Sequence, residues 1–151
     1  MVAPVLAVRL GGFSHMMVTL VTAGCCGLLY FILSFRVVQL RLAHKINFGD
    51  GGHDRLMSRI RAHANFAEYV PIVLILMGLI EMRTGVTEML TSTGVLLFLL
   101  RIVHAIGMGR ASPNPFRVAG AAGTWIILIG LSVWAIFLAY SHHAYALPPA
   151  V

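Results

Sequence analysis

The sequence is poor in charge, and above all in negative charge. Only 11% of its 151 residues are charged, and 5 Asp and Glu stand against 11 Lys and Arg. Hydrophobic residues make up 59% of the chain, which exceeds the share in ordinary soluble domains and indicates an integral membrane protein. The basic excess then fits loops that face anionic headgroups, because no soluble domain remains to form a nucleic-acid groove. We therefore expect membrane lipids, and no nucleic acid, as partners.

Cysteine is also scarce, and its placement excludes a disulfide framework. Cys25 and Cys26 are adjacent inside an apolar run, where they are expected to be small packing residues. His142 and His143 end the last apolar segment, but nothing nearby completes a ligand set, so no metal site is predicted. The first apolar segment is too long for a signal peptide and lacks a basic leader, so no cleavable signal is expected.

The chain does contain four long apolar segments, at about residues 15–41, 59–81, 86–108 and 117–140. Each can cross a hydrocarbon core of about 30 Å, which takes roughly 20 helical residues. Short connectors join them, including turns at residues 49–52 and 81–85, and residues 1–14 are predicted to be an irregular entry segment. The fold class is therefore all-α: a single-domain, integral membrane four-helix bundle. Basic residues gather in the first and third connectors, which the positive-inside rule places in the cytoplasm, with both termini outside.

Ionisable side chains enter these segments at one end of the predicted bundle. At about 100° per residue, Arg61, Asn65 and Glu68 fall on one helical face. A carboxylate inside a bilayer costs on the order of 3 kcal/mol, so it should face protein or a wet cavity. Either a polar clamp between helices or a binding site explains such a face. A binding site is favoured because other polar residues converge on the same end: Arg41, Arg101, His104 and Arg117.

The chemistry of this cluster predicts a type of ligand. Arginines make forked hydrogen bonds to carboxylates, while Glu68 suits an ammonium group, so a zwitterion with several carboxylates fits. A thiol held beside an arginine would have a lowered pKa, because the cation stabilises thiolate over thiol. The residues alone leave the ligand unnamed.

A sequence motif points to a family. The run RAHANFAEYVP at residues 61–71 resembles the second-helix signature of the MAPEG family, the membrane-associated proteins of eicosanoid and glutathione metabolism. RIVH at residues 101–104 is similar to the prostaglandin E synthase branch, and QLR at residues 39–41 resembles the end of the family's first helix. The likeness covers nearly the whole chain. The YVP and GDGG features are most similar to bacterial members, which implies the inner membrane of a bacterium.

The resemblance implies a homotrimer in which glutathione binds between adjacent subunits near the cytosolic side, while lipophilic electrophiles enter from the bilayer. It implies these binding residues: Arg61, Asn65, Glu68, Arg41, His104 and Tyr69. Arg117 stands where the family places its thiol-activating arginine, so it is the expected catalytic residue. The stabilised thiolate would attack an electrophile or reduce a hydroperoxide. The implied function is that of a glutathione-dependent membrane transferase or peroxidase.

Three positions depart from the family's pattern. Ala64 stands where several members carry a second arginine, and Met108 replaces a tyrosine common on the third helix. Val118 occupies the position of a serine found in the prostaglandin branch. These losses argue against prostaglandin isomerase activity and keep open a non-catalytic lipid-binding or scaffold protein of the same fold. A channel or transporter subunit is a third alternative, although the sequence lacks broken-helix pairs and inverted repeats.

Overall fold

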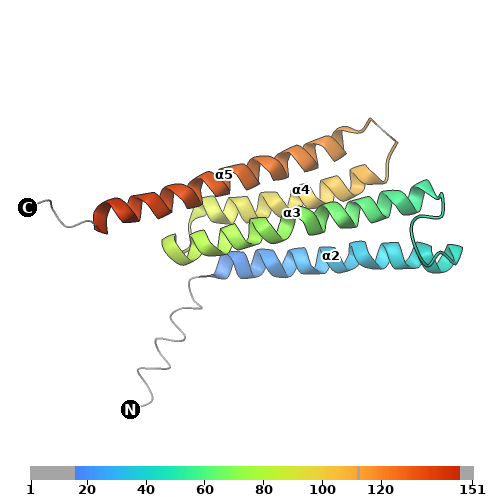
Figure 1. Ribbon diagram of the computed structural model, residues 1–151, viewed down its shortest axis with the longest axis horizontal. Coiled ribbons are helices and arrows are strands. Elements are labelled where there is room, and N and C mark those ends of the chain that lie inside the picture. Colours follow the sequence, from blue (N-terminus) through green and yellow to red (C-terminus); the bar gives the residue numbers. More distant parts are fainter. Residues whose placement is uncertain (1–15, 112, 147–151) are drawn as a thin grey trace, which may run out of the picture.

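The structure, a computed structural model, describes residues 16–111 and 113–146. These residues form four helices, in order α2 (Met17–His44), α3 (Asp54–Thr84), α4 (Glu88–Met108) and α5 (Pro115–Ala146) (Figure 1). All four are long and apolar enough to cross a membrane. The predicted all-α membrane four-helix bundle is therefore confirmed. The predicted entry segment 1–14 and the side chains of His142 and His143 lie outside the described residues.

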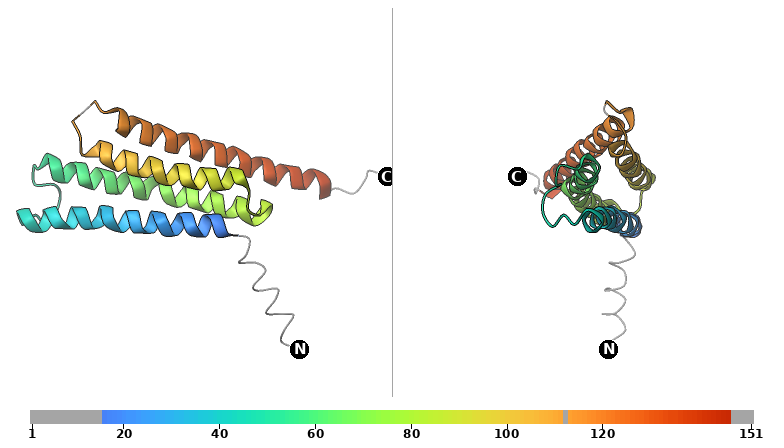
Figure 2. Two further views of the ribbon diagram at one scale, coloured as in Figure 1. Left: turned by 180° about the vertical axis from the view of Figure 1, so that it is seen from behind. Right: turned by 90° about the vertical axis from the view of Figure 1, so that its right-hand side faces the viewer.

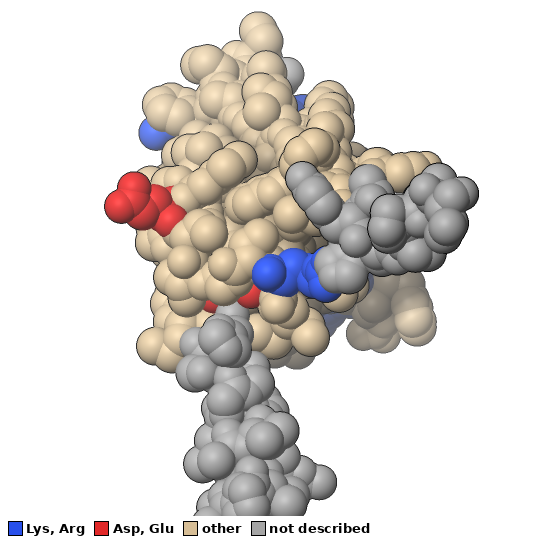
Figure 3. All heavy atoms as spheres, turned by 90° about the vertical axis from the view of Figure 1, so that its left-hand side faces the viewer, with Lys and Arg blue, Asp and Glu red and all other residues tan. Residues whose placement is uncertain are grey.

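The helices run alternately up and down, so the bundle has two distinct ends. The α2–α3 and α4–α5 loops lie together at one end, called the loop end below, and the short α3–α4 turn lies at the other (Figures 1 and 2). The most extensive packing is between α4 and α5 and between α2 and α3. The predicted basic connectors therefore meet at the loop end, whereas charged side chains are sparse at the α3–α4 end (Figure 3).

Apolar side chains cover the outside of the bundle as well as its core. The core is a narrow column that includes Val73, Met77 and Leu97. Large side chains such as Leu20 and Ile126 are more than two-thirds exposed, at 70% and 71%. Such a surface is stable in lipid and not in water, because water would have to hydrate a continuous apolar face. The chain is thus a multi-pass integral membrane protein, as predicted.

Helix α3 differs from expectation at its end, and the difference has a structural role. The helix continues to Thr84, so Glu81 is helical and does not form part of a turn. Its carboxylate is fully buried and accepts hydrogen bonds from the backbone N–H groups of Val18 and Thr19, both at 2.8 Å. These donors belong to the first turn of α2, whose N-cap residue Met16 makes no side-chain cap. Glu81 therefore caps a different helix and offsets its N-terminal partial positive charge.

Candidate functional site

The polar centre of the bundle is Arg101 on α4, which is only 2% exposed. Its Nη1 donates a hydrogen bond to Asn65 Oδ1 of α3 at 2.9 Å, and its Nη2 donates to the carbonyl of Gly120 on α5 at 2.8 Å. The Thr124 hydroxyl donates to the same carbonyl at 2.8 Å. One guanidinium thus joins three helices at one level. Its Nε is buried without a hydrogen-bond partner, which leaves one donor unsatisfied within the described chain.

Close approach of α4 and α5 makes this network possible. A methyl group on Gly120 would lie 2.5 Å from the His104 Cβ and 2.8 Å from its Cα, so only glycine fits at this crossing. Gly107 makes a similar contact with the backbone of Arg117 at the start of α5. The AGAAG patch at the start of the fourth segment therefore brings the Gly120 carbonyl within reach of Arg101.

The predicted site residues divide into two groups in the folded chain. Asn65 and Tyr69 are half-buried and His104 is buried, so these three point toward neighbouring helices. The Tyr69 ring lies 6.4 Å from the ring of Trp125 on α5, centroid to centroid. Arg41 is also half-buried, and its Nη1 donates to the Asn47 carbonyl at 3.1 Å, within the loop that follows α2.

The other group lies on the outside of the bundle. Arg61, Glu68 and Arg117 are exposed in the single chain, and the cavity at the loop end is lined by other residues. One chain therefore brings Asn65 together with Arg101 but does not bring Glu68 and Arg117 into that cavity. The predicted site residues nevertheless all lie between the loop end and the middle of the bundle, because α3 and α4 run in opposite directions (Figure 1).

The depth of Glu68 in the membrane can be estimated from the hydrogen bond between Arg101 and Asn65. Helix α4 has 21 residues and a length of about 31 Å, close to the thickness of a hydrocarbon core. Arg101 lies about 10 Å from the loop end of α4, and Asn65 shares its level through their hydrogen bond. Glu68 is about 4.5 Å deeper along α3. For a hydrocarbon core that coincides with α4, an exposed carboxylate thus lies near the middle of the span.

Several residues make contacts that the sequence does not predict. The sequence places Arg101 among the polar residues at one end, but its bond to Asn65 depends on helix register and has no sequence signal. Arg36, near the end of the first apolar segment, lies beside Arg55 and Arg59 at a cavity. The four-residue spacing of Arg55 and Arg59, which puts both on one helical face, was the available signal.

Comparison with known proteins gives a consistent result. The family model described as the MAPEG family matches residues 19–137. The chain is 36% identical over 113 residues to a protein of Escherichia coli strain K12 named inner membrane protein YecN, a match that covers 75% of this chain and 86% of that protein. The protein of the same name from Escherichia coli O6:H1 matches with the same identity and coverage.

Proposed function

Since the chain belongs to the MAPEG family, we propose that it is a glutathione-dependent membrane transferase or peroxidase that acts on lipophilic electrophiles or hydroperoxides. Its bacterial relatives carry the name of an inner membrane protein, and this chain is likewise a multi-pass protein of the inner membrane. The positive-inside rule puts the loop end in the cytoplasm and both termini on the other side.

The observation that carries the proposal is the exposed Glu68 at mid-membrane depth. A carboxylate that faced acyl chains there would cost on the order of 3 kcal/mol, so the α3 face that carries it needs a polar cover. A second copy of the chain with a zwitterionic peptide between the two supplies that cover. A homotrimer, as the family resemblance implies, places such a face of each subunit against its neighbour.

The side chains of this face fit the peptide. Asn65 uses its amide oxygen to accept from Arg101, which leaves its amide NH2 group to donate to a ligand carboxylate. Arg61, one helical turn nearer the loop end, offers a guanidinium fork for a carboxylate, and Glu68 accepts from an ammonium group. Arg41, His104 and Tyr69 are the further binding residues that we assign to the site.

Bound glutathione supplies the thiol nucleophile. Arg117, exposed in the first turn of α5, is the residue that we assign to stabilise the thiolate, and in an oligomer it reaches the peptide held by an adjacent subunit. Its positive charge favours loss of the thiol proton to water at neutral pH. Arg101, buried between the helices, positions Asn65 by fixing the orientation of the amide.

Calorimetry of the purified oligomer with glutathione is the direct test. We expect saturable binding, together with a thiolate absorbance that appears on mixing. Arg117→Leu is expected to abolish the absorbance while the oligomer, followed by light scattering, stays intact, because Arg117 is exposed and its loss leaves the bundle core unchanged. Absence of glutathione binding by the wild-type oligomer would end the proposal.

A second function is favoured by the three departures from the family pattern. Ala64 and Met108 are half-buried, and Val118 is exposed next to Arg117. They replace polar side chains, and they favour a non-catalytic lipid-binding or scaffold protein of the same fold. Lipid retained at the subunit interface of the purified oligomer, with no thiol turnover, would support this second function over the first.

A further inference from the structure

A basic cavity of about 460 Å³ opens at the loop end of the bundle, apart from the proposed glutathione site. Its walls come from α2, from the first three turns of α3 and from the end of α4 with the loop that follows. The arginines that line it are Arg36, Arg55, Arg59 and Arg110. Among the described residues that line it, Asp54 is the only acidic one, so the cavity carries an excess of positive charge.

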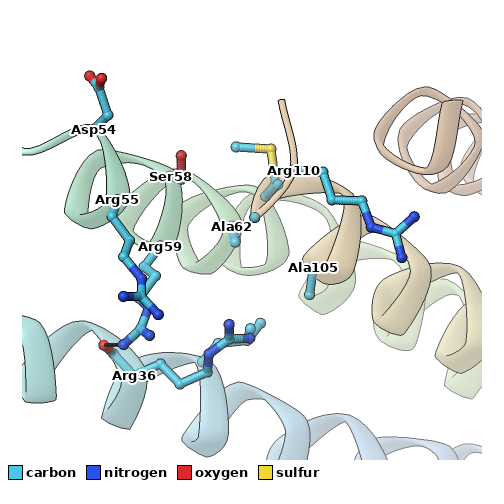
Figure 4. A pocket seen from close by; sticks show the side chains of 11 residues that line it. Arg36, Asp54, Arg55, Ser58, Arg59, Ala62, Ala105 and Arg110 are labelled. Atoms are coloured by element: carbon cyan, nitrogen blue, oxygen red, sulfur yellow. Dashed lines mark hydrogen bonds between the residues drawn. The ribbon is translucent and has the colours of Figure 1, made fainter. Parts of the chain in front are cut away.

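Three of these arginines gather where α2 and α3 meet at the cavity (Figure 4). Arg55 and Arg59 extend from α3 toward Arg36 on α2, whereas Asp54 points away from them (Figure 4). Arg59 Nη1 donates to the backbone carbonyl of Arg36 at 2.6 Å, which holds the two helices together and leaves the remaining guanidinium donors of Arg59 available. Arg110 lies on the other side, with its guanidinium carbon 4.4 Å from the centre of the Phe116 ring.

Like charges that converge in this way repel one another, and the repulsion is larger in a partly desolvated cavity than in water. An anion between the guanidinium groups removes this cost. The inner wall of the cavity is apolar, formed by the buried side chains of Leu33, Ala62 and Ala105. The cavity thus combines a cationic rim with an apolar floor at the end of a membrane bundle.

We infer that this cavity binds a phosphate-bearing anion through Arg36, Arg55 and Arg59. Guanidinium groups from two helices match the several acceptor oxygens of a phosphate, with which arginine forms paired hydrogen bonds. Basic pockets between membrane helices bind phospholipid headgroups in this way. The phosphate belongs either to an anionic phospholipid or to a free phosphate compound. The inference does not depend on the proposed glutathione chemistry.

The test uses the full chain with two probes that distinguish these sources. The first is native mass spectrometry of protein purified from vesicles of phosphatidylglycerol or, for comparison, phosphatidylcholine. The second is calorimetric titration with inorganic phosphate in a zwitterionic detergent. Retention of phosphatidylglycerol over phosphatidylcholine identifies a headgroup site, and saturable phosphate binding without lipid retention identifies a site for a free compound.

The decisive variant is Arg55→Gln, because Arg55 is exposed and contributes charge to the cavity without packing in the core. We expect Arg55→Gln to weaken binding of whichever probe the wild-type protein binds, by about tenfold or more. The double variant Arg36→Gln/Arg55→Gln should abolish this binding. Arg55→Lys should retain part of the affinity. Arg83→Gln is the matched control, since Arg83 is exposed at the opposite end of the bundle.

An unchanged thermal transition of Arg55→Gln in the absence of probe shows that the variant is folded. If the double variant does not fold, the binding measured for Arg55→Gln alone tests the inference. Equal binding by wild type and folded Arg55→Gln overturns the inference. Absence of both lipid retention and phosphate binding in the wild-type protein overturns it as well.

Discussion

At the scale of single residues, Glu81 shows how a buried charge stabilises a membrane bundle. Its two oxygens accept from two N–H groups at the start of α2, and the side chain is buried by the surrounding helices. We expect Glu81→Gln to lower the free energy of unfolding by about 2–3 kcal/mol, because a neutral amide offers one acceptor and no charge. Thermal unfolding in detergent measures the change.

Glu88→Gln is the control for this prediction. Glu88 is exposed in the first turn of its own helix, where a carboxylate stabilises by less than about 1 kcal/mol. A loss at Glu81 no larger than that at Glu88 would contradict the role of Glu81 as a cap between helices.

A substitution at Asn65 can distinguish its structural role, the hydrogen bond with Arg101, from its proposed role in ligand binding. In Asn65→Asp, the new carboxylate still accepts from Arg101, so we expect the protein to unfold at the wild-type temperature or above it. The amide donor is lost and a negative charge faces the carboxylates of glutathione. Affinity for glutathione should therefore fall about tenfold or more by calorimetry. Unchanged affinity would show that Asn65 only holds Arg101.

At the scale of helices, the close contact between α4 and α5 near the loop end depends on Gly107 and Gly120. We expect Gly120→Ala to destabilise the protein by about 1–3 kcal/mol, because the new methyl group would meet the backbone of His104 and the helices would have to separate. Loss of the bond from Arg101 to the Gly120 carbonyl adds to this cost.

Gly130→Ala provides a matched control on the same helix. In the part of the chain that the structure describes, nothing lies within 4 Å of a methyl group at Gly130, so alanine is expected to be neutral or to stabilise by up to about 1 kcal/mol through helix propensity. Thermal unfolding of both variants in one detergent compares them directly. If Gly120→Ala is as neutral as Gly130→Ala, α4 and α5 are not held in close contact at Gly120.

At the scale of the whole molecule, we expect the proposed site to be shared between subunits, since Glu68 and Arg117 both lie on the outside of one chain. Glu68→Gln and Arg117→Leu should each abolish glutathione-dependent turnover. Co-expression of the two variants should restore part of it, because some interfaces in a mixed oligomer combine an intact Glu68 with an intact Arg117. Turnover is measured on oligomers isolated with a different affinity tag on each variant. No restoration in verified mixed oligomers would place the site within one subunit.

The sequence by itself determined the membrane spans, the all-α class and the family. Hydrophobic runs of bilayer length can satisfy their backbone groups in lipid only as helices, so their number follows from composition along the chain. The motif at residues 61–71 carried the family likeness because its polar residues are fixed in spacing on one helix.

Only the tertiary structure decided which polar groups meet. Arg101 bonds to Asn65, Glu81 caps α2, and Arg36 joins Arg55 and Arg59 at a cavity, in each case across a separation of nineteen residues or more. Such pairs depend on the rotation and the axial register of packed helices. Those are set by small contacts such as Gly120 against His104, and no local pattern in the sequence encodes them.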